Sequence, residues 1–129
     1  MEQNTHMSIS PLLVGKMIEI GQDGASASLT ATKDMAADER GLVHGGFTFG
    51  LADFAAMLAV NDPNVVLGGA NTRFLAPVSV GQEMVAKASI ESTKGRKRVV
   101  KVAVSVGDKV VMDGELTCFV LDQHVLGPE

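Results

Sequence analysis

The sequence has no tryptophan, no tyrosine and only one cysteine among its 129 residues. The single cysteine, Cys118, excludes an internal disulfide and a cysteine-rich zinc site. Its apolar surroundings indicate a small buried core residue. Sequence patterns typical of a zinc hydrolase, a phosphate-binding loop or a dinucleotide site are also missing. We therefore expect no metal and no bound cofactor.

Positive charge is scarce as well, and the net charge is −4. This balance argues against nucleic acid or an anionic membrane as the main partner. No apolar stretch reaches the ~20 residues that span a bilayer, and the polar first ten residues do not resemble a signal peptide. We expect a cytoplasmic protein.

Length and pattern predict a single domain over residues 1–129, with loose tails at residues 1 to about 10 and at 123–129. Apolar residues at helical spacing, followed by the stop signal NDPN, predict one helix at about 45–61. Apolar alternation predicts strands over residues 14–20, 25–32, 65–74, 83–92, 99–106 and 109–121. This order predicts an α+β fold with one helix packed on one antiparallel sheet.

The predicted helix carries a single acid. Between Phe47 and Val60 only Thr48 and Asp53 are polar, which indicates a buried helix. An unpaired carboxylate in such a setting costs several kcal/mol. Asp53 is therefore either satisfied by a neighbouring hydroxyl or Arg73, or it has a chemical use.

The acid shares its helical stripe with small residues. At helical spacing, Gly46, Gly50, Asp53 and Met57 lie on one side of the helix. Glycine inside a helix costs ~0.5–1 kcal/mol relative to alanine, so the space beside the acid is expected to have a use. We expect a second backbone or a ligand there, with Gly46 and Met57 beside an apolar substrate cavity.

The helix begins with His44-Gly45-Gly46. The first N–H groups of a helix have no partner within it, and they attract negative charge. A thioester carbonyl develops such charge when it is attacked, so this helix start is a candidate oxyanion hole. His44 is alternatively a capping or packing residue.

One helix does not easily supply the whole site. Gly45 and Asp53 are eight residues apart, or about 12 Å along the helix axis. A reacting carbonyl must lie ~3 Å from both the donor and the attacking group. Two antiparallel helices from two subunits meet this condition, which predicts a homodimer with its active site at the subunit interface.

The residues just described resemble a known family. The helix segment is similar to that of hotdog-fold thioesterases of the phenylacetyl-CoA type, in the spacing from His44 to Asp53 and in the letters HGGFTFGLADFAAMLAVN. A second similar segment reads NTRFLAPVSVGQEMVAKASI, and TKGRKR resembles the family's basic turn. The resemblance covers about residues 12 to 121.

This resemblance implies a long central helix wrapped by an antiparallel sheet, and a dimer or a dimer of dimers. It implies hydrolysis of an acyl-CoA substrate without a metal or cofactor. Asp53 would be the base or nucleophile, Gly45 the N–H donor to the thioester oxygen, and His44 the residue that orients the loop or polarises the carbonyl. Asn61 matches a residue often found at the end of this helix, and we expect it to contact the substrate.

Two positions depart from the family pattern. Asp38 stands where many relatives have asparagine, six residues before the histidine. The stretch at residues 65–69 has no hydroxyl, although some relatives hold the attacking water with a serine or threonine there. These departures keep open a hotdog protein that binds acyl-CoA or another small ligand without turnover. A third candidate is a hydratase or dehydratase on a related fold. It would need a catalytic histidine–acid pair in another arrangement, which the spacing of His44 and Asp53 fits poorly.

A basic cluster follows the fourth predicted strand. Lys94, Arg96 and Arg98 are either a solvated hairpin turn or a clamp for the phosphates of CoA, which suits the bidentate geometry of arginine. Arg73, within an apolar strand, is expected to pair with an acid or to contact phosphate.

Overall fold

A computed structural model describes all 129 residues, with one α-helix, six β-strands and a short 3₁₀ helix at Lys33–Met35. The helix α1 spans Gly45–Val60. The strands are β1 (Lys16–Gly21), β2 (Gly24–Thr30), β3 (Val65–Phe74), β4 (Glu83–Lys94), β5 (Lys97–Val106) and β6 (Lys109–Val120). No helix is long and apolar enough to cross a membrane.

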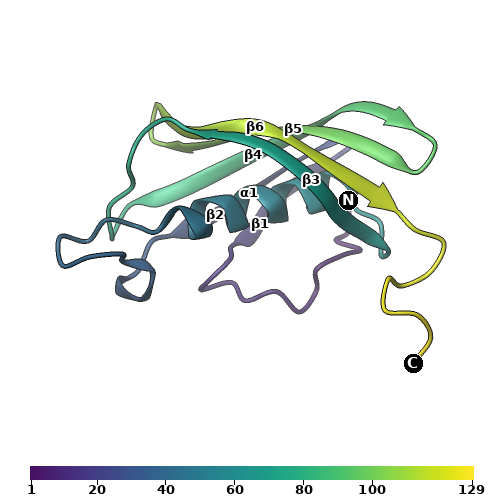
Figure 1. Cartoon of the computed structure of the whole chain (residues 1–129), viewed down its shortest axis with the longest axis horizontal. Helices are drawn as coiled ribbons and strands as arrows, with labels where there is room; N and C mark the ends of the chain where they lie inside the picture. The colour runs from purple at the N-terminus through teal and green to yellow at the C-terminus, as the bar shows by residue number, and fades with distance from the viewer.

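The six strands form one antiparallel sheet in the order β1-β2-β4-β5-β6-β3. The sheet curves over α1, which lies along its inner face (Figure 1). This arrangement confirms the predicted hotdog fold, a long helix wrapped by a single sheet. The edge strands are β1 and β3, so one side of β3 has no strand beside it.

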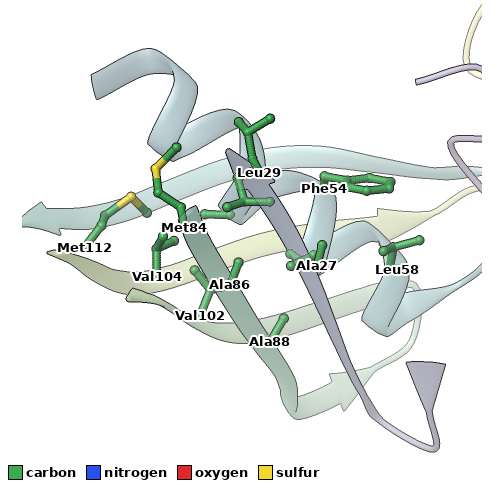
Figure 2. Close-up of a cluster of buried hydrophobic side chains, with 14 of the residues drawn as sticks. Ala27, Leu29, Phe54, Leu58, Met84, Ala86, Ala88, Val102, Val104 and Met112 are labelled. Atoms are coloured by element: carbon green, nitrogen blue, oxygen red, sulfur yellow. The ribbon is translucent and has the colours of Figure 1, made fainter. Parts of the chain in front are cut away.

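The core lies between the helix and the inner face of the sheet. Alternate residues of β4 point into it, with Met84 and Ala86 fully buried, as the pattern predicted. Phe54 and Leu58 of α1 belong to the same buried cluster as Ala27 and Leu29 of β2 (Figure 2). The 26 buried apolar residues form one cluster. Because α1 is apolar on nearly all sides, this core encloses most of it.

Some strands begin or end at slightly different residues than predicted, at positions where a glycine adopts a positive φ. Gly15 has a φ of 140°, and the chain before it is a turn, so β1 begins at Lys16 rather than at residue 14. Gly95 has a φ of 60° and forms the turn between β4 and β5, which lets both strands run closer to that turn than predicted.

Helix α1 ends at Val60 and is capped by Asn61, whose φ of 55° lies in the left-handed region that asparagine tolerates. The side-chain amide of Asn61 accepts a hydrogen bond from Asn4 N–H at 2.8 Å and donates one to Glu2 C=O at 2.8 Å. Thr5 is buried, and the ring of His6 lies 6.3 Å from that of Phe54. The segment predicted as a loose N-terminal tail therefore contacts α1.

Candidate active site

Asp53 lies in the third turn of α1. Its Oδ1 atom is buried and has no hydrogen-bond partner in the chain. Burial disfavours the charged form and raises the pKa of this carboxyl from 3.8 to about 6. The carboxylate is thus mostly ionised at neutral pH, yet weakly solvated.

The structural alternative for Asp53, satisfaction by a hydroxyl or by Arg73, is wrong. The Thr48 hydroxyl donates to Met84 Sδ at 3.4 Å. Arg73 forms a bidentate pair with Asp113, at 3.1 Å from Nε to Oδ1 and 3.0 Å from Nη2 to Oδ2. A buried polar atom without a partner is rare in folded proteins, and such atoms are often found at functional sites.

The charge of Asp53 acts on the thiol of Cys118. Burial, and secondarily the charge of Asp53, raise the pKa of its thiol to about 12. Cys118 is fully buried in β6, which confirms the core role predicted for it. A thiol that stays protonated is not a nucleophile, so Cys118 is not a candidate for the attacking group.

The start of α1 presents backbone donors. Gly45 is the first helical residue. The backbone N–H of Phe47 donates a hydrogen bond to His44 C=O at 3.1 Å. The Gly45 and Gly46 N–H groups have no acceptor within the helix. They are available, together with the helix dipole, to a developing negative charge.

His44 is the N-cap residue, but its side chain makes no capping hydrogen bond. Its N–H donates to Met35 C=O at 2.9 Å, which fixes the loop. The exposed imidazole folds over Gly46, where an added Cβ would lie 3.0 Å from the ring, and meets Phe47 edge-on. The geometry favours packing over capping for this histidine.

A groove opens beside the helix start, with a volume of about 430 Å³. Its residues come from the loop before α1, from the first turn of α1 and from the end of β3 onward: Val43, Gly45, Thr48, Phe74, Leu75, Ala76, Pro77 and Val78. The sequence prediction missed this groove. The sequence contained only one indication of it, the apolar run FLAPV at residues 74–78. This run reaches the helix start only through tertiary folding, so its position could not be predicted from local pattern.

The stripe that contains Asp53 is only partly open. A Cβ added to Gly50 would meet no atom within 4 Å, so space lies beside the acid at that position. Met57, by contrast, is 1% exposed and belongs to the core. Gly46 is exposed, but a side chain there would meet the His44 ring. Roles for Met57 and Gly46 in substrate binding remain predictions.

Among the other predicted binding residues, Asn61 and the basic turn lie away from the helix start. Asn61 holds the N-terminal segment. At the basic turn, Lys94 is exposed, Arg96 pairs with Asp122, and the Arg98 guanidinium donates to the Gly95 and Lys97 carbonyls. None of these contacts tests their binding to CoA.

The basic turn and the helix start lie at opposite ends of β3. Residues Arg98 and Cys118 are paired across β5 and β6, and Cys118 is paired with Leu67 near the start of β3. Gly45 packs against Phe74 at the end of β3, with 3.2 Å between an added Cβ and the ring. A strand of 10 residues is roughly 33 Å long, so one chain does not bring the two features together.

Asp38, one of the two departures from the family pattern, has a local structural role. Its Oδ1 accepts hydrogen bonds from Arg40 N–H at 2.9 Å and Leu42 N–H at 3.1 Å. The side chain thereby closes the turn that leads into the loop before α1.

Residues 40–113 match the family model described as Thioesterase superfamily. Methylthioribose-1-phosphate isomerase of Aquifex aeolicus (strain VF5) is 46% identical over 128 residues, covering 98% of this chain and 28% of that protein. Transcription factor FapR of Thermoanaerobacter sp. (strain X514) is 32% identical over 116 residues, covering 88% and 58%. The chain thus spans about a quarter of the first relative and just over half of the second.

Solved structures agree in fold. An uncharacterized protein of Pyrococcus horikoshii is 53% identical, with 98% of each chain covered and a TM-score of 0.97. A single-residue variant of phenylacetic acid degradation protein PaaI from Thermus thermophilus is 27% identical, with 84% of this chain and 95% of that chain covered and a TM-score of 0.78. The names of the relatives describe different activities.

Proposed function

The chain belongs to the thioesterase superfamily, and we propose that it hydrolyses an acyl-CoA to a free acid and CoA. The observation that carries this proposal is the half-buried carboxylate of Asp53, whose Oδ1 atom is buried without a partner, next to the space at Gly50. The family match and the free N–H groups at the helix start support it.

The reaction needs one base and one oxyanion donor. Asp53 accepts a proton from water, whose oxygen then attacks the thioester carbonyl carbon. The carbonyl oxygen becomes negative and accepts a hydrogen bond from Gly45 N–H, while His44 keeps this loop in place. The C–S bond breaks next, and the proton held by Asp53 returns to the departing sulfur. Direct attack by the Asp53 carboxylate on the carbonyl is the alternative first step.

The two groups act from different subunits in this proposal. Edge strand β3 has free N–H and C=O groups on one side, so antiparallel pairing with β3 of a second copy is expected to form the dimer. In such a pair, the start of one β3 lies beside the end of the other. The basic turn of one subunit then approaches the Gly45 of its partner, which one chain alone does not achieve.

Changes at Gly50 test whether a second subunit uses the open space. In an isolated chain, Gly50→Ala removes a helix-interior glycine without a clash, and stability should rise by about 0.5–1 kcal/mol. If substrate and a partner occupy the space, activity instead falls with side-chain size, from Gly50→Ala to Gly50→Leu. Light scattering and kcat/KM follow both effects. A stable monomer at micromolar concentration, or a fully active Gly50→Leu variant, would contradict the shared site.

The basic turn is proposed to hold the phosphates of CoA. Replacing Lys94, Arg96 and Arg98 together by alanine should raise KM and leave kcat nearly unchanged, because the contact is the same in the ground and transition states. Added salt should raise KM in the same direction. An unchanged KM would assign these residues to a solvated turn. To bind phosphate, Arg73 would have to leave Asp113, and Arg96 would have to leave Asp122.

A second candidate function is acyl-CoA binding without turnover. The similarity to proteins named as transcription factors favours it, as do the turn-closing role of Asp38 and the missing hydroxyl at residues 65–69. Release of free thiol from a panel of acyl-CoAs distinguishes the two functions. Cys118 is buried, so the folded protein adds no thiol signal of its own.

A further inference from the structure

The first nine residues contact the second half of α1, and we call them the N-terminal strap (residues 1–9). They form no helix or strand. Asn61, the cap of α1, holds the strap through two hydrogen bonds to its backbone, and Figure 1 places the N-terminus beside this end of the helix. The Met1 amine donates a further hydrogen bond to Ile20 C=O of β1 at 3.4 Å. Because only a few contacts fix the strap, the loss of one of them is expected to release it.

One side chain of the strap is both ionisable and half-buried. The ring of His6 lies 6.3 Å from the ring of Phe54, measured between centroids, and its Nδ1 atom is 2.7 Å from the hydroxyl of the buried Thr5. Phe54 belongs to the core cluster, so the imidazole borders the core. Burial lowers the pKa of the His6 imidazole from its ordinary value of 6.5, because the charged form loses hydration there.

No neighbouring charge compensates a protonated imidazole at this position. The ionisable groups of the strap, of β1 and of α1, other than His6 itself, are the Met1 amine, Glu2, Lys16, Glu19 and Asp53. None of them forms an ion pair with the imidazole. A proton on His6 therefore places an unpaired positive charge beside Phe54, and such a charge is more stable in water.

The backbone of His6 also favours release. Its φ of 57° lies in the left-handed region, which is uncommon for a residue other than glycine. Such a conformation persists only while surrounding contacts hold it. The side-chain amide of Gln3 supplies two of these contacts, donating to Thr5 C=O at 2.9 Å and to His6 C=O at 3.3 Å. Once the strap leaves the helix, His6 is free to adopt an ordinary φ.

We propose that His6 is a pH-sensitive switch, which keeps the N-terminal strap on α1 while the imidazole is neutral and releases the strap when the imidazole is protonated. Release frees the side-chain amide of Asn61 and uncovers the Phe54 side of the helix. Because the pKa of His6 is lowered in the closed form, the closed form is fully stabilised above pH 6.5 and loses stability as pH falls through the lowered pKa. The switch does not depend on the proposed function, and its test needs no substrate.

Hydrogen exchange of the whole chain, followed by mass spectrometry at pH 8 and pH 5, tests the switch. The protection of the strap amides is expressed relative to the exchange rate of an unfolded peptide at the same pH. It should fall several-fold at pH 5, and by at most about 30-fold, which is the limit for one proton and an unshifted pKa of 6.5. The protection of β5 should not fall, and it serves as the internal control for the rest of the fold.

Two substitutions assign the effect to His6. His6→Asn removes the ionisable ring and keeps a residue that tolerates a positive φ, so strap protection should no longer differ between pH 8 and pH 5. His6→Lys keeps a positive charge at both pH values, so the strap should be as weakly protected at pH 8 as at pH 5. His124→Asn is the matched control, because His124 is exposed in the C-terminal segment, and it should keep the pH dependence of the unchanged protein.

Three results would overturn the switch. The first is strap protection in the unchanged protein that is equal at pH 8 and pH 5. The second is a loss of protection at pH 5 that persists in His6→Asn, since another group would then carry the titration. The third is a loss of protection in β5 together with the strap, which would show acid unfolding of the whole chain instead of release of one segment.

Discussion

Asp53→Asn is expected to lower kcat by at least about a hundredfold, because general-base catalysis contributes ~10²–10⁴-fold and an amide does not accept the proton. KM should change much less, because the substitution leaves the proposed CoA contacts of the basic turn unchanged. The variant keeps nearly the same shape, so the fold should remain. Steady-state kinetics on the best acyl-CoA measure the effect.

The pKa of Asp53 makes the same experiment sensitive to pH. The base must be ionised, so kcat/KM should rise with pH and reach half of its plateau near pH 6, where the carboxyl titrates. A profile with its midpoint near pH 4 would show an ordinary, solvated carboxylate instead.

The free energy of unfolding should fall as pH rises, whereas kcat/KM should increase. A folded-state pKa raised from 3.8 to about 6 means that folding favours the protonated acid, so its stabilising contribution is complete below pH 3.8 and lost as pH rises through 6. At pH 7 the ionised Asp53 therefore costs up to about 3 kcal/mol. Asp53→Asn should raise the thermal midpoint at pH 7, and this gain should disappear near pH 4.

Asp108→Asn is the matched control, because Asp108 is an exposed acid in the turn between β5 and β6. It should leave kcat and the thermal midpoint at pH 7 nearly unchanged. An Asp53→Asn variant that hydrolyses within a few-fold of the unchanged protein would remove Asp53 from catalysis, and with it the main support for an enzyme.

The sequence predicted those parts of the fold that depend on local pattern. The helix was found at its observed start because its apolar run begins after His44-Gly45 and ends before Pro63. The strands were found because their apolar residues alternate, as in β4, where Met84 and Ala86 are buried. Such patterns express burial on one face, which a sequence records directly.

Contacts between distant segments were not predictable in this way. The hydrogen bonds of Asn61 to Asn4 and Glu2 join polar residues that follow no periodic pattern. The same holds for the groove, where the end of β3 meets the helix start only after the chain has folded. For the site itself, the sequence singled out Asp53 as an acid on an apolar helix. The structure was needed to exclude Arg73 as its partner.

Removal of the Gly45 N–H is expected to lower kcat by about a hundred- to a thousandfold, the usual loss for one oxyanion donor. Gly45→Pro makes this change with little effect on the fold. Gly45 is the first helical residue, where proline is well accepted, and His44 before it is already extended with φ −63° and ψ 130°.

Gly45→Ala is the control for side-chain bulk. Both variants place a Cβ about 3.2 Å from the Phe74 ring, which is exposed and free to shift. Only proline removes the N–H. A large loss in Gly45→Pro with near-normal turnover in Gly45→Ala assigns the effect to the donor, whereas equal losses would assign it to crowding against Phe74.

Mixing two inactive variants tests whether Gly45 and Asp53 act from different subunits. In a hybrid dimer of Asp53→Asn with Gly45→Pro, one site combines the intact Gly45 of the first chain with the intact Asp53 of the second, and the other site has neither. After random exchange of subunits, half of the dimers are hybrids, so about a quarter of the original activity should return. If both groups came from the same chain, every site would lack one of them. No activity would return, although each variant alone would still show its full loss. Recovery on mixing therefore separates a shared active site from two independent ones, a distinction that neither single substitution makes.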